Sequence, residues 1–369
     1  MSTNKIVRVG LIGLGEVTQV AHIATLGFLS DYFTITYLCD VSQEALRHSS
    51  QKVINHVPHV TQSPRELCAS PDVDLVFIAS SDEYHTDHVI EALKHDKHVF
   101  VEKPMALCAR DADAIITAEQ KSQGRVMVGY MRRFATAFVD LVQEVGGIDK
   151  ILYARVRDII GPNSHFVSQS GTFPKVFTDF SPEAIAEKKA KADDIVNQAL
   201  AVECGVPVTS ETTKMWRLLC GLGSHDLSAM REALGQPEDV GGAFMSPNFW
   251  SAMFRYPGFS VTYESGIDNV PRFDAHLEVY SLQKSVKVSW DTPYVKGLPV
   301  TMLIRENVDG AYRETLVRRT YEDPYTLEMK ELYDVVVGGK EIKTTAKDAK
   351  EDLRTFQLLM KAGQRQHRR

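Results

Sequence analysis

Several features that mark other protein classes are missing from this sequence of 369 residues. No apolar run approaches the roughly 20 residues that a membrane-spanning helix needs. The five cysteines are odd in number and scattered, and none forms a Cys-x-x-Cys pair, so the sequence predicts neither a disulfide framework nor a zinc site. Basic residues are not in excess, since 42 Lys and Arg stand against 48 Asp and Glu, and nucleic acid is therefore not an expected partner.

Signals for export are missing as well. The first residues contain no separate apolar signal segment, and a strand pattern begins almost at once. The chain also contains no Asn-x-Ser/Thr sequon. With unpaired cysteines, these absences predict a cytoplasmic protein. No group of Asp, His and Cys has the spacing of metal ligands, so no metal is expected.

A strand followed by a glycine turn opens the chain. Ile6 to Ile12 is apolar in the manner of a buried strand, and Gly13-Leu14-Gly15 leads into helix-like sequence. This is the position of the G-x-G-x-x-G motif of dinucleotide folds, in which the first glycine permits a tight turn and the second lets the backbone approach a pyrophosphate. The third glycine is replaced by Thr18, so helix and strand should pack slightly further apart. A glycine pair alone also fits an ordinary strand-to-helix turn.

A second strand, "FTITYLCDVS", ends in Asp40. An acid at this place hydrogen-bonds the ribose 2′-hydroxyl of a dinucleotide and repels a 2′-phosphate, which favours NAD over NADP. The alternative is that Asp40 caps the helix expected near residues 43–50.

Strands and helices then alternate up to Tyr130. Strands are expected at 75–79, 99–101 and 125–130, and helices at 86–94 and 109–122. This spacing predicts a doubly wound parallel sheet, whose ligands sit beyond the carboxyl ends of the strands. The residues predicted to bind the cofactor there are Gly13, Gly15, Glu16, Val17, Asp40, Ser80, Glu102 and Lys103.

Four segments together resemble one family. They are "VGLIGLGEV", "LCD", "DLVFIASSDEYHTDHVIEALKHDKHVFVEKPMAL" and "GYMRRF", and the last is close to the form in inositol dehydrogenases. The sequence resembles the Gfo/Idh/MocA family of nicotinamide-dependent sugar and cyclitol oxidoreductases. The resemblance implies an α/β chain with an N-terminal Rossmann domain at 1–130. A C-terminal α+β domain with an open, largely antiparallel sheet is expected at 131–369.

The resemblance also gives a role to the Glu-Lys-Pro triplet. In the family its lysine points into the active site, and Lys103 matches it. An ammonium there orients the reacting oxygen and takes part in proton transfer, work that suits lysine because burial moves its pKa easily. A cis bond before Pro104 is expected in this fold. The alternative is a surface pair of Glu102 and Lys103 worth less than about 1 kcal/mol.

His225 is the second catalytic candidate. "GLGSHDLSAMREALG" resembles the family's catalytic helix, which usually carries an Asp-x-x-x-His pair on one face. Here the aspartate position is Gly221, and Asp226 is not expected to face the same way on a regular helix. The resemblance implies that His225 accepts the substrate proton. The alternative is a core histidine bonded to backbone.

Sequence beyond residue 150 predicts the second domain. A strand is expected at 150–160, then a polar stretch, then a helix capped by Ser181. An antiparallel meander follows, with strands at about 252–256, 259–265, 275–281, 285–290, 300–307 and 312–320. Two helices, near 324–337 and 346–361, close the chain. The free face of such a sheet often forms a subunit interface in this family, so a homodimer or homotetramer is expected.

Weaker candidates for substrate contact lie near this domain's start. Arg132 matches the inositol-dehydrogenase arginine, but it would equally pair with an acid. Asp158, Asn163 and His165 lie on and after the first strand, where the family often places substrate contacts, although the stretch also resembles any surface loop. Trp216 is expected in the core, and His85 as a structural cap. The predicted substrate-binding residues are Lys103, Arg132, Asp158, Asn163, His165 and His225.

The sequence therefore predicts an NAD-dependent oxidoreductase acting on a secondary alcohol of a sugar, sugar derivative or cyclitol. Two alternatives stay open. Tightly held NAD would allow a redox-neutral lyase, glycosidase or epimerase that works through a transient keto-sugar. A non-catalytic regulator that binds the dinucleotide is the other alternative.

Overall fold

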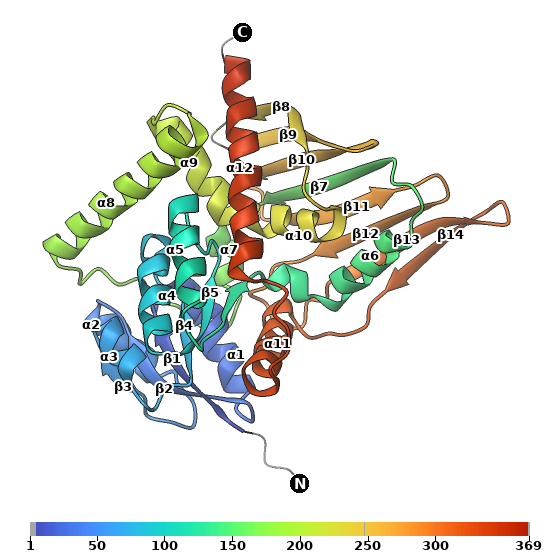
Figure 1. Ribbon diagram of the computed structural model, residues 1–369. Helices are drawn as coiled ribbons and strands as arrows, with labels where there is room; N and C mark the ends of the chain where they lie inside the picture. The colour runs from blue at the N-terminus through green and yellow to red at the C-terminus, as the bar shows by residue number, and fades with distance from the viewer. Residues whose placement is uncertain (1–4, 247, 368–369) are drawn as a thin grey trace. The chain divides into compact units, whose positions relative to one another are not determined.

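The computed structural model describes residues 5–246 and 248–367, with side chains up to residue 364. The chain forms two compact units, whose elements are labelled in Figure 1. The first unit holds the chain up to Gly129, together with Gly171–Ala199 and Glu328–Glu351. The second holds Tyr130–Ser170, Leu200–Leu327 and the chain from Asp352 onward.

The first unit is built on a parallel sheet of six strands in the order β3-β2-β1-β4-β5-β6. The strands are β1 Val7–Ile12, β2 Phe33–Cys39, β3 His59–Thr61, β4 Leu75–Ile78, β5 His98–Glu102 and β6 Val126–Gly129. Every residue of β4 and β6 is buried, as expected for a parallel sheet covered on both faces. This order confirms the predicted Rossmann-type topology, and its switch point lies between β1 and β4.

Helices connect these strands. They are α1 Ile23–Phe28, α2 Gln43–Ser50, α3 Pro64–Ala69, α4 His85–Lys94 and α5 Ala109–Glu119, and α8 Pro182–Asn197 lies in the unit's second segment. At the third glycine position, Thr18 is buried and its Oγ1 donates to the Gly13 carbonyl at 2.7 Å. A π-helical turn at Thr18–His22 precedes α1. Ser181 caps α8 as predicted, since its side chain accepts from the Ala184 amide.

The second unit contains a sheet of eight strands in the order β14-β13-β12-β11-β7-β10-β9-β8. They are β7 Tyr153–Ile160, β8 Asp239–Met245, β9 Phe249–Tyr256, β10 Phe259–Ile267, β11 Phe273–Tyr280, β12 Lys284–Trp290, β13 Thr301–Val308 and β14 Ala311–Val317. The predicted simple meander is wrong in one respect, because β7 inserts between β11 and β10 and pairs parallel with β10. The other pairs are antiparallel. The sequence did not predict β8, whose glycines lie at a register shift.

Helices cover one face of this sheet. Those of the second unit are α6 Thr136–Gly146, α7 Asn163–Val167, α9 Ser210–Leu218 and α10 Ser224–Leu234, while α11 Pro324–Gly338 and α12 Ala346–His367 contribute to both units. Contacts run from α6 to β12 and β13 and from α10 to β7. The other face carries cross-strand ion pairs, in which Glu264 of β10 contacts Arg155 and Arg157 of β7.

No helix between residues 5 and 367, position 247 aside, is long and apolar enough to cross a bilayer. All five cysteines are buried free thiols.

Candidate active site

The glycine turn after β1 has the geometry that its sequence predicts. Gly13 has a φ of 92°, and a Cβ there would lie 2.4 Å from the Ser80 backbone, so only glycine fits. A Cβ on Gly15 would meet nothing within 4 Å. Gly15 and Glu16 are exposed, and Val17 is half-buried. The backbone at Gly15 is therefore open to the close approach of a ligand.

Asp40 links this turn to the next helix. One carboxylate oxygen accepts the Leu14 amide at 2.8 Å, and the other accepts the Ser42 amide at 2.8 Å. Burial raises the pKa of Asp40, while these backbone hydrogen bonds oppose the shift. The N-cap of α2 is Ser42, whose side chain accepts the Ala45 amide at 2.9 Å. Asp40 thus lies at the edge where the fold places a ribose. It does not cap α2, because the N-cap of α2 is Ser42.

These residues fit a dinucleotide. The open backbone at Gly15 is suited to a pyrophosphate, and the Asp40 carboxylate is suited to a ribose hydroxyl. Val41, directly after Asp40, is 56% exposed and offers an apolar surface. A nicotinamide dinucleotide would be held by the Gly15 backbone and by Asp40.

Lys103 follows β5 at the same edge of the sheet. The Lys103–Pro104 bond is cis, as the sequence predicts. Lys103 is half-buried, and its amide donates to Glu102 at 3.1 Å. Glu102 is buried, which contradicts the alternative of a surface Glu–Lys pair.

His22 holds the other oxygen of Glu102. Its Nε2 lies 2.8 Å from Glu102 Oε1, and the imidazole is fully buried. Burial alone would raise the pKa of Glu102, but the hydrogen bond and charge of His22 together with the charge of Lys103 lower it overall. His22 thus holds the Glu102 carboxylate inside the unit, and the predicted contact of Glu102 with the cofactor stays a prediction. His22 was not predicted from the sequence, where its signal is a histidine within the otherwise apolar run of residues 20–24.

His85 joins the Ser80 loop to the Lys-Pro turn. Its Nδ1 lies 2.8 Å from the Pro104 carbonyl, and its Nε2 lies 3.0 Å from the Ser80 carbonyl. His85 is therefore structural, but it bridges two loop carbonyls and does not cap α4 as predicted, since the N-cap of α4 is Tyr84. The Ser80 hydroxyl contacts His88 Nδ1 at 3.0 Å, and burial lowers the pKa of His88 to about 4. His88 is accordingly neutral at physiological pH.

The second unit contains a buried cluster of Arg132, Asp158 and Asp226, which are 3%, 0% and 1% exposed. Arg132 Nη1 lies 3.1 Å from Asp158 Oδ2 and also bonds Asp226. The guanidinium sits over the rings of Phe273 and Trp290, with its carbon 5.5 and 5.6 Å from their centroids. Arg132 thus pairs with acids, which is the alternative that the sequence left open.

This cluster buries two carboxyl groups with one cation. Burial raises the pKa of Asp226 well above its usual range, and the neighbouring Asp158 raises it further, while Arg132 opposes the shift. Burial raises the pKa of Tyr263, and the nearby charges of Asp226 and Asp158 raise it as well. Asp226 therefore keeps its proton to a higher pH than an exposed aspartate would.

His225 lies in the first turn of α10 and is half-buried. A π-helical turn at Leu219–Gly223 precedes it, so the regular spacing assumed for Gly221 and His225 does not apply. A Cβ on Gly221 would meet nothing within 4 Å, so glycine leaves open space there. Asp226, which sequence reasoning set aside, turns instead toward Arg132.

The remaining predicted residues lie in different surroundings. Asn163 and His165 are exposed on α7, and His165 Nε2 contacts the Gln169 amide nitrogen at 3.0 Å. They do not share the buried environment of Asp158. Trp216 is fully buried against Phe356, as predicted.

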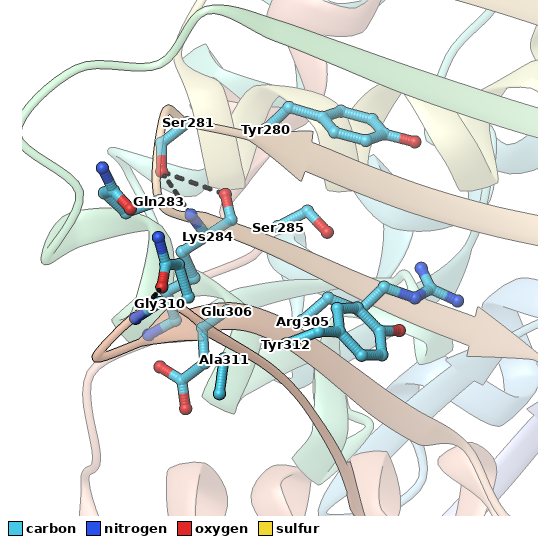
Figure 2. A pocket seen from close by; sticks show the side chains of 11 residues that line it. Tyr280, Ser281, Gln283, Lys284, Ser285, Arg305, Glu306, Gly310, Ala311 and Tyr312 are labelled. Carbon is cyan, nitrogen blue, oxygen red and sulfur yellow. Dashed lines mark hydrogen bonds between the residues drawn. The ribbon is translucent and has the colours of Figure 1, made fainter.

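An open pocket of about 410 Å³ lies in the second unit at the ends of β11 to β14. Figure 2 shows its lining, in which Ser281 bonds Lys284 across a turn. None of the predicted site residues contributes to it. Lys284 is paired with Glu144, and Arg305 with Glu278 and Glu314, so these two cations are already committed to carboxylates. Across the described part of the chain, no three His, Cys, Asp or Glu side chains could hold a metal ion.

Comparison with known proteins matches the part of the chain that forms the parallel sheet to an NAD-binding family. Residues 7–130 match the family model GFO_IDH_MocA, described as an oxidoreductase family with an NAD-binding Rossmann fold. Myo-inositol 2-dehydrogenase of Thermotoga maritima is 34% identical over 44% of this chain and 49% of its own. Inositol 2-dehydrogenase/D-chiro-inositol 3-dehydrogenase of Shouchella clausii is 38% identical over 37% of this chain and 39% of its own. The matched region thus spans half or less of these relatives.

A solved structure is similar over nearly the full length. The putative NADPH-dependent oxidoreductase from Desulfitobacterium hafniense aligns with a TM-score of 0.73, covering 98% of this chain and 96% of its own. Its sequence identity is 16%, so the likeness concerns the fold.

Proposed function

We propose that this chain is an NAD-dependent dehydrogenase of the Gfo/Idh/MocA oxidoreductases, whose family model its residues 7–130 match. Its substrate would be a secondary alcohol of a sugar, sugar derivative or cyclitol. The inositol dehydrogenases similar to its first domain support the cyclitol end of this range. One observation carries the proposal, namely that the open Gly15 backbone, Asp40 and Lys103 all follow strands at the carboxyl edge of one parallel sheet.

The chemistry divides between the cofactor and the chain. When bound, the nicotinamide ring exchanges a hydride with the carbon of the substrate alcohol. Lys103 holds and polarises the substrate oxygen, and His85 and the buried Glu102 fix the turn on which it stands. His225 accepts the hydroxyl proton. Lys103 and His225 belong to different units, and Lys103→Met tests the role of the lysine by itself.

A panel of polyols tests this function. The full chain is incubated with NAD or NADP and with cyclitols and sugars, while the absorbance of reduced nicotinamide and the substrate concentration are both followed. The proposal expects substrate loss matched by reduced nicotinamide for at least one polyol. Absence of turnover with every polyol, together with dinucleotide binding, would favour a non-catalytic regulator.

A redox-neutral enzyme is the second candidate. Gly221 favours it, because this position four residues before His225 carries no carboxylate, and a Cβ there would meet nothing within 4 Å. A keto-sugar formed and then reduced at the same site would allow elimination or epimerisation without net oxidation. In the same panel this enzyme consumes substrate while reduced nicotinamide does not accumulate.

We also propose that the protein is a cytoplasmic homodimer or homotetramer. In the second unit, the sheet face opposite α6 and α10 exposes Phe244, Met253 and Leu316 beside its ion pairs. Such a mixed apolar and charged face suits association with a second copy. Sedimentation equilibrium tests the assembly, and a monomer at micromolar concentration would contradict it.

A further inference from the structure

A segment without regular secondary structure, residues 173–181, belongs to the first unit and packs against the turns that follow β1 and β2. From the sequence it is expected only as part of a polar stretch. It reaches α8 from α7 and makes three separate contacts on the way, with Gln19, His48 and the start of α2.

Gln19 makes the first contact. Its side-chain amide donates to the Lys175 carbonyl at 3.0 Å, and its carbonyl accepts the Lys175 amide at 2.8 Å. The same side chain also donates to the Leu14 carbonyl at 3.0 Å, and it is 7% exposed. A buried amide therefore ties the segment to the glycine turn itself.

Phe177 and Asp179 make the other two contacts. The Phe177 ring lies 5.8 Å from the ring of His48 on α2. Asp179 accepts the Ser42 hydroxyl with one oxygen and the Glu44 amide with the other, at 3.0 Å for the latter. The segment thus runs from the turn after β1 to the turn after β2, where this fold binds the pyrophosphate and the ribose.

Asp179 uses the donors that a 2′-phosphate would need. A helix N-terminus binds phosphate through free backbone amides and a nearby hydroxyl. At α2 the Ser42 amide goes to Asp40, the Ala45 amide goes to the Ser42 side chain, and the Glu44 amide and Ser42 hydroxyl go to Asp179. The Ser42 hydrogen bond, followed by the Glu44 amide, lowers the pKa of Asp179, so this carboxylate is ionised at neutral pH.

We propose that Asp179 determines cofactor specificity. Its carboxylate occupies the start of α2 next to Asp40, so the site takes a dinucleotide with a free ribose 2′-hydroxyl and rejects one with a 2′-phosphate. This inference rests on the proposed dinucleotide site and names a second acid where the sequence offered Asp40 alone. The acid comes from 139 residues further along the chain, as the positions 40 and 179 show.

Binding measurements test the proposal without requiring a substrate. NADH and NADPH are titrated by calorimetry into the full chain and into Asp179→Asn, Asp179→Ala and Asp193→Asn. Asp193 is the matched control, because it is an exposed acid on α8, the helix that follows the segment, and it pairs with Lys189 on the same helix. The wild type is expected to prefer NADH, and Asp179→Ala to shift the NADPH-to-NADH affinity ratio toward NADPH by about tenfold.

The NADPH-to-NADH affinity ratios of the variants decide between the outcomes. A shift in both Asp179 variants with an unchanged Asp193→Asn supports the inference. An equal ratio in wild type and Asp179→Ala, with dinucleotide bound in both, overturns it and leaves the proposed function standing. Failure of the wild type to bind either dinucleotide overturns the proposed function and the inference with it. Thermal unfolding of each variant separates a loss of fold from a change of specificity, and Asp179→Asn supplies the milder substitution.

Discussion

The two units place their acids in opposite ways. In the first unit, Asp40 and Asp179 lie at the sheet edge and accept backbone amides, and Glu102 is matched by His22. In the second, Asp158 and Asp226 are buried around one arginine. Backbone amides orient Asp40 and Asp179 at the edge proposed to bind the cofactor, whereas Glu102 is held inside the unit by His22. Asp158 and Asp226 share one cation in the interior, where removing one partner leaves an unpaired charge.

The largest expected effect is at the edge of the first unit. Lys103→Met removes the ammonium that we place on the substrate oxygen, so kcat should fall by about 10³-fold while the NADH dissociation constant stays within about twofold. Lys94→Met is the control, because Lys94 is exposed and pairs with Glu91 on α4. Steady-state kinetics with calorimetric binding checks this. Equal kcat in the two variants would contradict the assignment.

The buried cluster should respond in stability. Arg132→Met leaves two buried carboxyl groups without their cation and should lower the free energy of unfolding by about 3–5 kcal/mol. Arg155→Met removes a half-buried arginine of β7 that pairs with Glu264 on the sheet surface, and should cost less than about 1 kcal/mol. Chemical denaturation measures both. Similar losses in the two variants would show that burial does not distinguish the two arginines.

The pH dependence of Asp226 sharpens the same comparison. Its pKa is higher in the folded chain than the usual 3.8. Between pH 3.8 and the folded pKa, the folded state therefore keeps a proton that the unfolded state has lost. The stability that Asp226 contributes is full below pH 3.8 and declines as pH rises through its folded pKa. The unfolding free energy of wild type minus that of Asp226→Asn should therefore fall with rising pH. A difference that stays flat or rises with pH would contradict a raised pKa of Asp226 in the folded chain.

A smaller effect is expected from His85. His85→Leu removes the bridge between the Ser80 and Pro104 carbonyls and loosens the turn that carries Lys103, so kcat should fall by about ten- to hundredfold. His95→Leu, at the other end of α4, should leave kcat unchanged. A loss in NADH affinity without a loss in kcat would assign His85 to the cofactor loop instead.

The sequence predicted the edge of the first unit well because each of its residues follows a strand. Gly13, Asp40, Ser80 and Lys103 need only the order of strands and helices to be placed together. Asp179 escaped prediction because nothing local indicates that an extended polar segment returns to α2. The sequence left open that Arg132 pairs with an acid, but it could not identify Asp158 and Asp226 as the partners, since that pairing depends on how β7 packs against α10.

Irregular geometry accounts for other misses. The π-helical turn at Leu219–Gly223 changes the spacing before His225, and helix periodicity assumes a regular turn. The insertion of β7 between β10 and β11 could not be read from strand patterns, because alternation shows which face is buried and says nothing of the neighbouring strand. The roles of His225, Asn163 and His165 remain predictions.

The most direct test of the central claim is a calorimetric titration of NADH into wild type and Gly15→Val. A Cβ at Gly15 would meet nothing within 4 Å, so the variant should keep its unfolding temperature while its methyl groups enter the space assigned to the pyrophosphate. The account predicts saturable binding of one NADH per chain in wild type and at least about tenfold weaker binding in Gly15→Val. Equal affinity in the two proteins, or no binding by wild type, would contradict it.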